Sequence, residues 1–83
     1  MKILYFAWLR ERVGTAEEDI VPPAEIATVG ALTDWLANRS PGHASALAER
    51  RAIRVAVDRT FAPAEQPIAG ASEIAYFPPF TGG

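Results

Sequence analysis

Two segments near opposite ends of this 83-residue chain carry apolar side chains at nearly every position. Successive side chains of a β-strand point to opposite faces, so a strand with one face in water alternates apolar and polar residues. Residues 53–58 alternate in this way, whereas residues 2–8 and 73–77 read as strands with two apolar faces. The fold therefore needs a sheet with a buried core face and, at two of its strands, a second apolar face that something else covers.

This second face is predicted to carry side chains from both segments: Leu4, Phe6, Trp8, Ala75 and Phe77. Burying one large apolar side chain stabilises a protein or a complex by about 1.5–3 kcal/mol. Several such side chains on one face favour association, so we interpret this face as a docking surface for a partner protein. The alternative is that a loop of the same chain, residues 61–67, folds over it.

The remaining segments predict an α+β fold with a mixed sheet of four to five strands and one main helix on one face. Between the two apolar segments we expect a helical turn at 9–13, a strand at 17–21, a helix from the N-cap Thr28 to residue 39, a weaker helical segment at 43–51, the strand at 53–58 and a very short strand at Ile68. His43, the only histidine, is predicted to lie on the surface. The order of elements alone leaves the strand pairing open.

Composition excludes several classes of function. The chain has no cysteine, which excludes disulfides, thiolate nucleophiles and cysteine-ligated metal centres. Its net charge of −2 and lack of a basic stripe argue against nucleic-acid binding. No segment approaches the roughly 20 apolar residues of a membrane span, and the opening stretch lacks the cleavage site of a signal peptide. We expect a cytoplasmic protein with no metal site and no nucleic-acid or membrane partner.

The sequence ends in a distinctive segment, Pro78-Pro79-Phe80-Thr81-Gly82-Gly83. Prolines cannot donate sheet hydrogen bonds and favour extended backbone, so we predict a domain at residues 1–77 and an extended tail at 78–83. The two glycines have no side chains, so the carboxylate of Gly83 can enter a narrow channel. A carboxylate is a poor electrophile, but its mixed anhydride with AMP can be converted by a sulfur donor to a thiocarboxylate. The ending therefore predicts a carrier whose reactive group is the carboxylate of Gly83.

Short motifs along the whole chain carry a family resemblance. They are Phe6-Ala7, Arg10-Glu11 and Gly14, then Val29 with Ala31-Leu32, then Val57-Asp58-Arg59-Thr60, then Pro67-Ile68 with Gly70, and finally the run from Glu73 to Gly83. With these motifs the chain resembles the small subunits of molybdopterin synthase, which are sulfur carriers. Asp58 departs from the pattern, since relatives often carry asparagine there.

The resemblance implies a β-grasp, or ubiquitin-like, fold and a complete set of partners. An adenylating enzyme would use ATP to activate Gly83, and a sulfurtransferase would supply sulfur. The tail would then enter the large catalytic subunit, which holds cyclic pyranopterin monophosphate and builds the dithiolene of molybdopterin in a heterotetramer. By position, the partner-contacting residues are Phe6, Arg10, Phe61 and Phe77. The chain itself would bind no cofactor and would act as the sulfur-donating subunit, without an active site of its own.

Other functions are compatible with the same residues. Carriers for thiamine synthesis or tRNA thiolation also end in two glycines, although they usually lack the Phe-Pro-Pro segment. A ubiquitin-like modifier would join the same carboxylate to lysines of other proteins. A β-grasp binding module with an incidental ending would not use the carboxylate at all.

Overall fold

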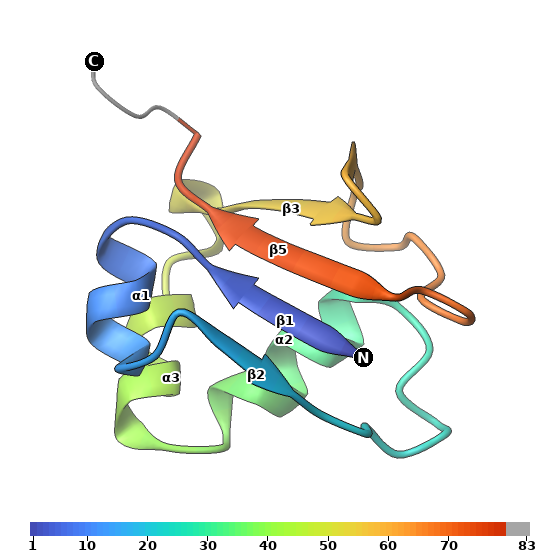
Figure 1. Cartoon of the computed structure of the whole chain (residues 1–83), viewed down its shortest axis with the longest axis horizontal. Coiled ribbons are helices and arrows are strands. Elements are labelled where there is room, and N and C mark those ends of the chain that lie inside the picture. Colours follow the sequence, from blue (N-terminus) through green and yellow to red (C-terminus); the bar gives the residue numbers. More distant parts are fainter. Residues whose placement is uncertain (80–83) are drawn as a thin grey trace.

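A five-stranded mixed sheet forms the framework of the chain in a computed structural model that describes residues 1–79. The strands are β1 (Lys2–Tyr5), β2 (Glu17–Asp19), β3 (Arg54–Val57), β4 (Thr60–Phe61) and β5 (Glu73–Phe77). Their order is β2-β1-β5-β3-β4, with β1 and β5 parallel at the centre and the other neighbours antiparallel (Figure 1). This pairing is the β-grasp arrangement, and it confirms the predicted fold class.

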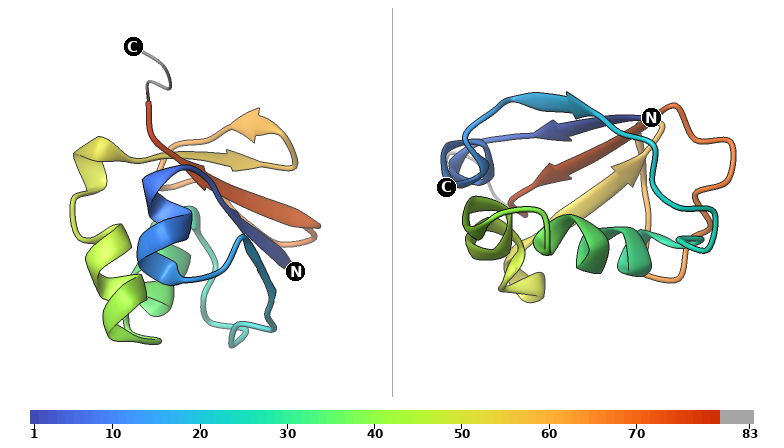
Figure 2. Two further views of the ribbon diagram at one scale, coloured as in Figure 1. Left: turned by 60° about the vertical axis from the view of Figure 1, so that its left-hand side comes forward. Right: turned by 90° about the horizontal axis from the view of Figure 1, so that it is seen from below.

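Helices cover one face of this sheet. They are α1 (Trp8–Val13), α2 (Val29–Ala37), α3 (Pro41–Leu47) and the 3₁₀ turn η1 (Arg50–Ala52). In Figure 2, α2 and α3 lie beneath the sheet, and α1 lies at one end of it. The predicted N-cap of the main helix is confirmed, because the Thr28 hydroxyl accepts a hydrogen bond from the amide of Ala31. Within residues 1–79, no helix is both long and apolar enough to cross a membrane.

The core lies between the sheet and these helices. The register sets Ile3 beside Ile74 and Tyr5 beside Tyr76, so both central strands send a branched and an aromatic side chain toward the helices. Other fully buried side chains come from the three helices: Leu9, Leu32, Leu36 and Leu47. The predicted core face of both apolar segments is therefore confirmed, up to Tyr5 and Tyr76.

Two predicted boundaries are wrong for local reasons. The first strand ends at Tyr5 rather than at residue 8, because Ala7 adopts a φ of 54° and Trp8 opens α1. Trp8 consequently packs against the core and does not belong to the second face. The weaker helical segment expected at 43–51 begins as α3 at Pro41 rather than at residue 43. Ser40 caps its N-terminus and proline fits the first helical position, so the break after α2 is also the start of α3.

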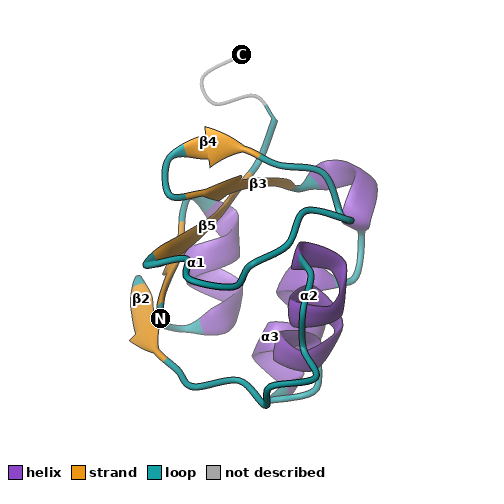
Figure 3. Ribbon diagram, turned by 90° about the vertical axis from the view of Figure 1, so that its right-hand side faces the viewer, coloured by secondary structure: helices purple, strands orange, loops and turns teal. Residues whose placement is uncertain are grey.

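Hydrogen bonds to α2 fix the position of the loop at 61–67. The amide of Gly30 donates to the carbonyl of Ala64 at 2.8 Å, and the amide of Val29 donates to the carbonyl of Gln66 at 3.0 Å. The loop therefore runs beside α2, on the helical side of the sheet (Figure 3). The alternative in which this loop covers the second face is wrong. The expected very short strand is a single bridge between Thr28 and Pro67, one residue before Ile68.

The turn between β3 and β4 gives a first testable prediction. Asp58 and Arg59 adopt positive φ values of 48° and 72°, and Oδ1 of Asp58 accepts hydrogen bonds from the amides of Ser72 and Glu73, both at 2.9 Å. Asp58→Ala removes this shared acceptor and should lower the free energy of unfolding by about 1–2 kcal/mol. Asp58→Asn keeps the oxygen and tolerates positive φ, so it should stay within about 0.5 kcal/mol of wild type. Urea titration of both variants measures the difference, and equal losses would show that the acceptor is unimportant.

Candidate functional site

The predicted tail directly follows the central strand β5. β5 ends at Phe77, after which Pro78 is buried and Pro79 is exposed. The sheet thus stops at the last residue of the predicted domain. The other predicted tail residues, Phe80, Thr81, Gly82 and Gly83, lie outside the described residues.

Aromatic side chains gather where β5 ends. The rings of Phe61 and Phe77 lie 5.5 Å apart between centroids, because both residues are neighbours of β3 in the sheet register. Phe61 is 78% exposed. Phe6 is 46% exposed. Its amide donates to the carbonyl of Tyr76 at 3.0 Å, which places Phe6 beside the C-terminal end of β5. Arg10 is exposed on α1, which begins two residues after Phe6.

These aromatic residues belong to the face of the sheet opposite the helices. Leu4 of β1, Ala75 of β5 and Ala56 of β3 are neighbours in register and form an apolar strip across it. The apolar residues of the second face, as the structure has it, are Leu4, Phe6, Ala56, Phe61, Ala75 and Phe77. Arg54, the neighbour of Phe77 in register, starts from the same side of β3. Within residues 1–79 no helix or loop packs over it (Figure 2). Ala56 and Ala75 are buried among their neighbours, so the exposed apolar surface of this face comes mainly from Phe6 and Phe61. Exposed aromatic side chains grouped on one face are typical of a protein interaction surface.

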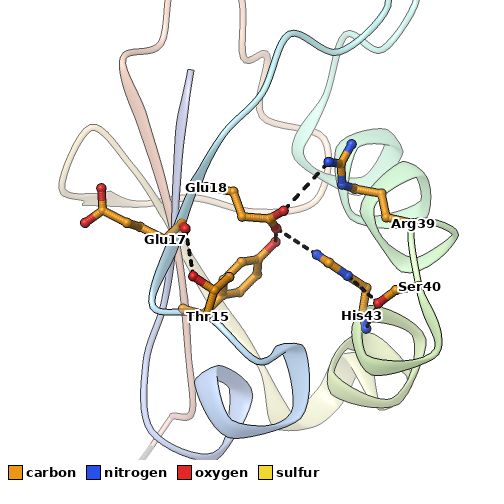
Figure 4. A network of polar contacts seen from close by, with 7 residues as sticks. Thr15, Glu17, Glu18, Arg39, Ser40 and His43 are labelled. Atoms are coloured by element: carbon orange, nitrogen blue, oxygen red, sulfur yellow. Dashed lines mark hydrogen bonds and ion pairs between the residues drawn. The ribbon is translucent and has the colours of Figure 1, made fainter.

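A polar cluster beneath β2 was not predicted. His43 is 7% exposed, so its predicted surface position is wrong. Its Nε2 lies 2.7 Å from the carboxylate of Glu18, and its Nδ1 lies 2.7 Å from the hydroxyl of Ser40 (Figure 4). The hydroxyl of Tyr5 also donates to Glu18, at 2.8 Å. A carboxylate only accepts, so Nε2 carries the hydrogen that Glu18 receives.

The electrostatics of this cluster indicate a structural role. Burial and the contact with Glu18 raise the pKa of the Tyr5 hydroxyl far above its ordinary value, so it remains a donor. Burial alone would raise the pKa of Glu18. Hydrogen bonds from His43 and Tyr5, with the charges of His43 and Arg39, outweigh burial and hold that pKa below its ordinary value. The half-buried carboxylate thus connects β1, β2 and α3.

Two sequence signals could have revealed the cluster. Glu18 alternates with the buried Ile20 on a strand, so its side chain must point toward the core face. Ser40 and His43 also have the spacing of an N-cap and its third helical residue. Neither signal identifies the partner, because Glu18 and His43 are 25 positions apart.

Comparison with known proteins now places the chain in a family. The family model described as "ThiS family" matches residues 3–83, including the whole tail. Molybdopterin synthase sulfur carrier subunits of Escherichia coli and Haemophilus influenzae are 37% and 36% identical to the chain, and each alignment covers 100% of the chain and 99% of the relative. The crystal structure of SAMP1 from Haloferax volcanii matches with a TM-score of 0.75 and 29% identity, covering 100% of this chain and 98% of that one. These findings confirm the resemblance: the chain belongs to the ThiS family, and two of its full-length relatives are sulfur carrier subunits of molybdopterin synthase.

Proposed function

We propose that the chain carries sulfur in molybdenum cofactor biosynthesis and that the carboxylate of Gly83 is the carrier group. The observation that supports this most is the similarity to two such carriers over the full length of the chain, tail included. The fold adds a physical reason, since the predicted tail follows directly from β5, a central strand that is paired on both sides.

The chemistry needs three steps with the chain as carrier. On a separate adenylating enzyme, the Gly83 carboxylate attacks the α-phosphate of ATP, which forms an acyl adenylate and releases pyrophosphate. A sulfurtransferase then supplies sulfur at the oxidation level of sulfide, and its attack on the acyl carbon expels AMP and leaves a thiocarboxylate. In the large subunit, this sulfur attacks a carbon of the pterin precursor and displaces an oxygen substituent from it, which forms a thioester. Water then cleaves the bond between the sulfur and the acyl carbon of Gly83, which leaves the sulfur on the pterin and regenerates the carboxylate. Tethering confines the sulfur to the partner's site, which favours the transfer.

The second face is the proposed docking surface for the large subunit. Phe6, Phe61 and Phe77 would be buried in the complex, and Arg10 would contact the partner from α1. The net charge of −2 suits a division of labour in which the other subunit holds the phosphate of the precursor. We propose a heterotetramer of two large and two small subunits that acts in the cytoplasm.

Intact-mass analysis tests the carrier role. The chain is incubated with ATP, the adenylating enzyme and the sulfurtransferase, and we expect a product with one oxygen replaced by sulfur. A variant lacking Gly83 should show no exchange, and its circular dichroism spectrum should remain that of the wild type. Conjugates between Gly83 and lysines of other proteins would support a modifier instead. An unchanged mass for the wild type would contradict both roles.

A second assay separates the carrier from its nearest alternative. Thiocarboxylated chain is mixed with the large subunit and the pterin precursor, and the dithiolene product is quantified. We expect one sulfur to be transferred for each chain consumed. A thiocarboxylate that supports thiazole formation or tRNA thiolation, but not this product, would assign the chain to another pathway.

A further inference from the structure

A cavity on the helical side of the sheet is separate from the second face. It has a volume of about 310 Å³ and lies between α2, β3 and the loop that follows β4. Its walls are mainly apolar and include Val29, Ile53, Val55 and Pro63. Sites for small organic molecules are typically mostly apolar cavities of roughly 300–1,000 Å³ with a few polar groups. The cavity is therefore large enough for a small ligand, although the chain is short.

Two buried hydroxyl groups form the inner wall of this cavity. Thr33 and Tyr76 both line it, and their oxygens lie 2.8 Å apart. The Thr33 hydroxyl also donates to the carbonyl of Val29 at 2.8 Å. Tyr76 is then the donor to Thr33, so the two hydroxyl groups satisfy one another, and the fully buried Tyr76 closes the inner end of the cavity.

Two arginines, Arg50 and Arg54, also line the cavity. Arg50 pairs with Asp34 at 2.8 Å and donates to the carbonyl of Leu47. The Arg54 guanidinium donates to the carbonyls of Ile53 and Arg51, at 3.1 and 3.4 Å. Within residues 1–79 it has no acidic partner within 4.0 Å. A guanidinium has five donor hydrogens, so Arg54 keeps donors for an anion.

We propose that this cavity binds a small amphipathic anion, a compact apolar body that carries one carboxylate or phosphate group. The apolar body contacts the walls formed by Val29, Ile53 and Val55, and the anionic group pairs with Arg54 at the edge of β3. A free phosphate alone would leave the apolar walls without a contact, and a neutral hydrocarbon would leave Arg54 without one. Because Tyr76 directly precedes Phe77 in β5, a bound ligand touches the same strand that carries the second face. This binding activity goes beyond the proposed sulfur-carrier role and does not depend on it.

Chemical-shift titration of the ¹⁵N-labelled full chain tests this site with three probes: phenylacetate, phenyl phosphate and the neutral phenylacetamide. We expect at least one anion to cause saturable shifts at the amides of Gly30, Val55 and Ala62, and the neutral amide to bind at least about tenfold more weakly. The anion that binds more tightly assigns the carboxylate or the phosphate class. Binding of phenylacetamide as tight as that of both anions would overturn the proposal.

Matched charge variants locate the anion. Arg54→Gln should weaken binding of the preferred anion about tenfold, which is the loss expected for one hydrogen bond to a charged group. Arg59→Gln removes the same charge at the β3–β4 turn, away from the cavity, and should change affinity less than about twofold. Equal weakening by both variants would reveal only general charge screening and would contradict the site.

A filled cavity provides an independent check. Ala62→Leu places a larger side chain at the cavity wall and should abolish the saturable shifts. The amide spectrum of Ala62→Leu shows directly whether this variant is folded. If it is not folded, the comparison of Arg54→Gln with Arg59→Gln tests the site instead. Wild-type affinity in folded Ala62→Leu, or the absence of saturable shifts with either anion in the wild type, would overturn the proposal.

Discussion

Phe61→Thr is expected to weaken binding of the chain to the large subunit of molybdopterin synthase about 100-fold. Aromatic side chains at the centre of an interface often contribute about 2–4 kcal/mol, and 2.7 kcal/mol corresponds to about 100-fold. Phe61 is 78% exposed in the isolated chain, so its ring stabilises the fold little before a partner arrives. Threonine keeps the β-strand preference at this position of β4, and the free energy of unfolding should change by less than about 1 kcal/mol.

The matched control is Val21→Thr. Val21 is 93% exposed, follows β2 and lies outside the second face, so the variant also replaces an exposed apolar side chain by threonine. Its affinity for the large subunit, measured by isothermal titration calorimetry, should equal that of the wild type. Equal weakening by the two variants would indicate a general loss of surface hydrophobicity. Wild-type affinity in Phe61→Thr would exclude this face as the docking surface.

Glu18→Ala is expected to lower the free energy of unfolding by about 3 kcal/mol. The carboxylate accepts hydrogen bonds from the buried donors Tyr5 and His43, and each donor left without a partner costs about 1–3 kcal/mol. Glu17→Ala is the matched control one residue earlier. Glu17 points to the other face and forms an exposed pair with Lys2 at 3.7 Å, so its loss should cost about 0–1 kcal/mol. Similar losses for the two variants would refute the structural role of the cluster.

The pH dependence of the Glu18→Ala effect follows from the pKa of this carboxyl. The folded protein holds the pKa of Glu18 below its unfolded value of about 4.3. A lowered pKa contributes stability that is complete above the unfolded value and is lost as the pH falls through the folded value. The difference between wild type and Glu18→Ala should therefore shrink in urea titrations below about pH 4. A difference that stays constant into this range would show that the ionised carboxylate is not its source.

The alternation of side chains was sufficient to predict the sheet and its second face, but it failed where the backbone turns. The apolar run continues through Trp8, so nothing in the pattern marks the positive φ of Ala7 that ends β1. A side chain's face follows from its strand only while the strand lasts. The predicted face of Leu4 was therefore right and that of Trp8 was wrong.

The polar cluster illustrates a different limit of sequence reasoning. A single histidine in a helical segment has no local feature that distinguishes a buried from an exposed position. Its burial depends on Glu18, which reaches it only because β2 pairs with β1 above α3. The cavity likewise depends on the packing of α2, β3 and the loop after β4, so no local sequence pattern predicts it. The carrier chemistry of Gly83, in contrast, was predicted from residue types alone, and it stays a prediction because Gly83 lies outside the described residues.

The parallel pairing of β1 with β5 has a consequence for biosynthesis. The last strand inserts between β1 and β3, so the hydrophobic centre of the sheet cannot close while residues 73–77 are still inside the ribosome. Pairing β1 with β5 closes a loop that contains every other strand and helix, and such long-range contacts form slowly. A chain that lacks β5 is thus unable to form the second face, because Ala75 and Phe77 belong to this strand.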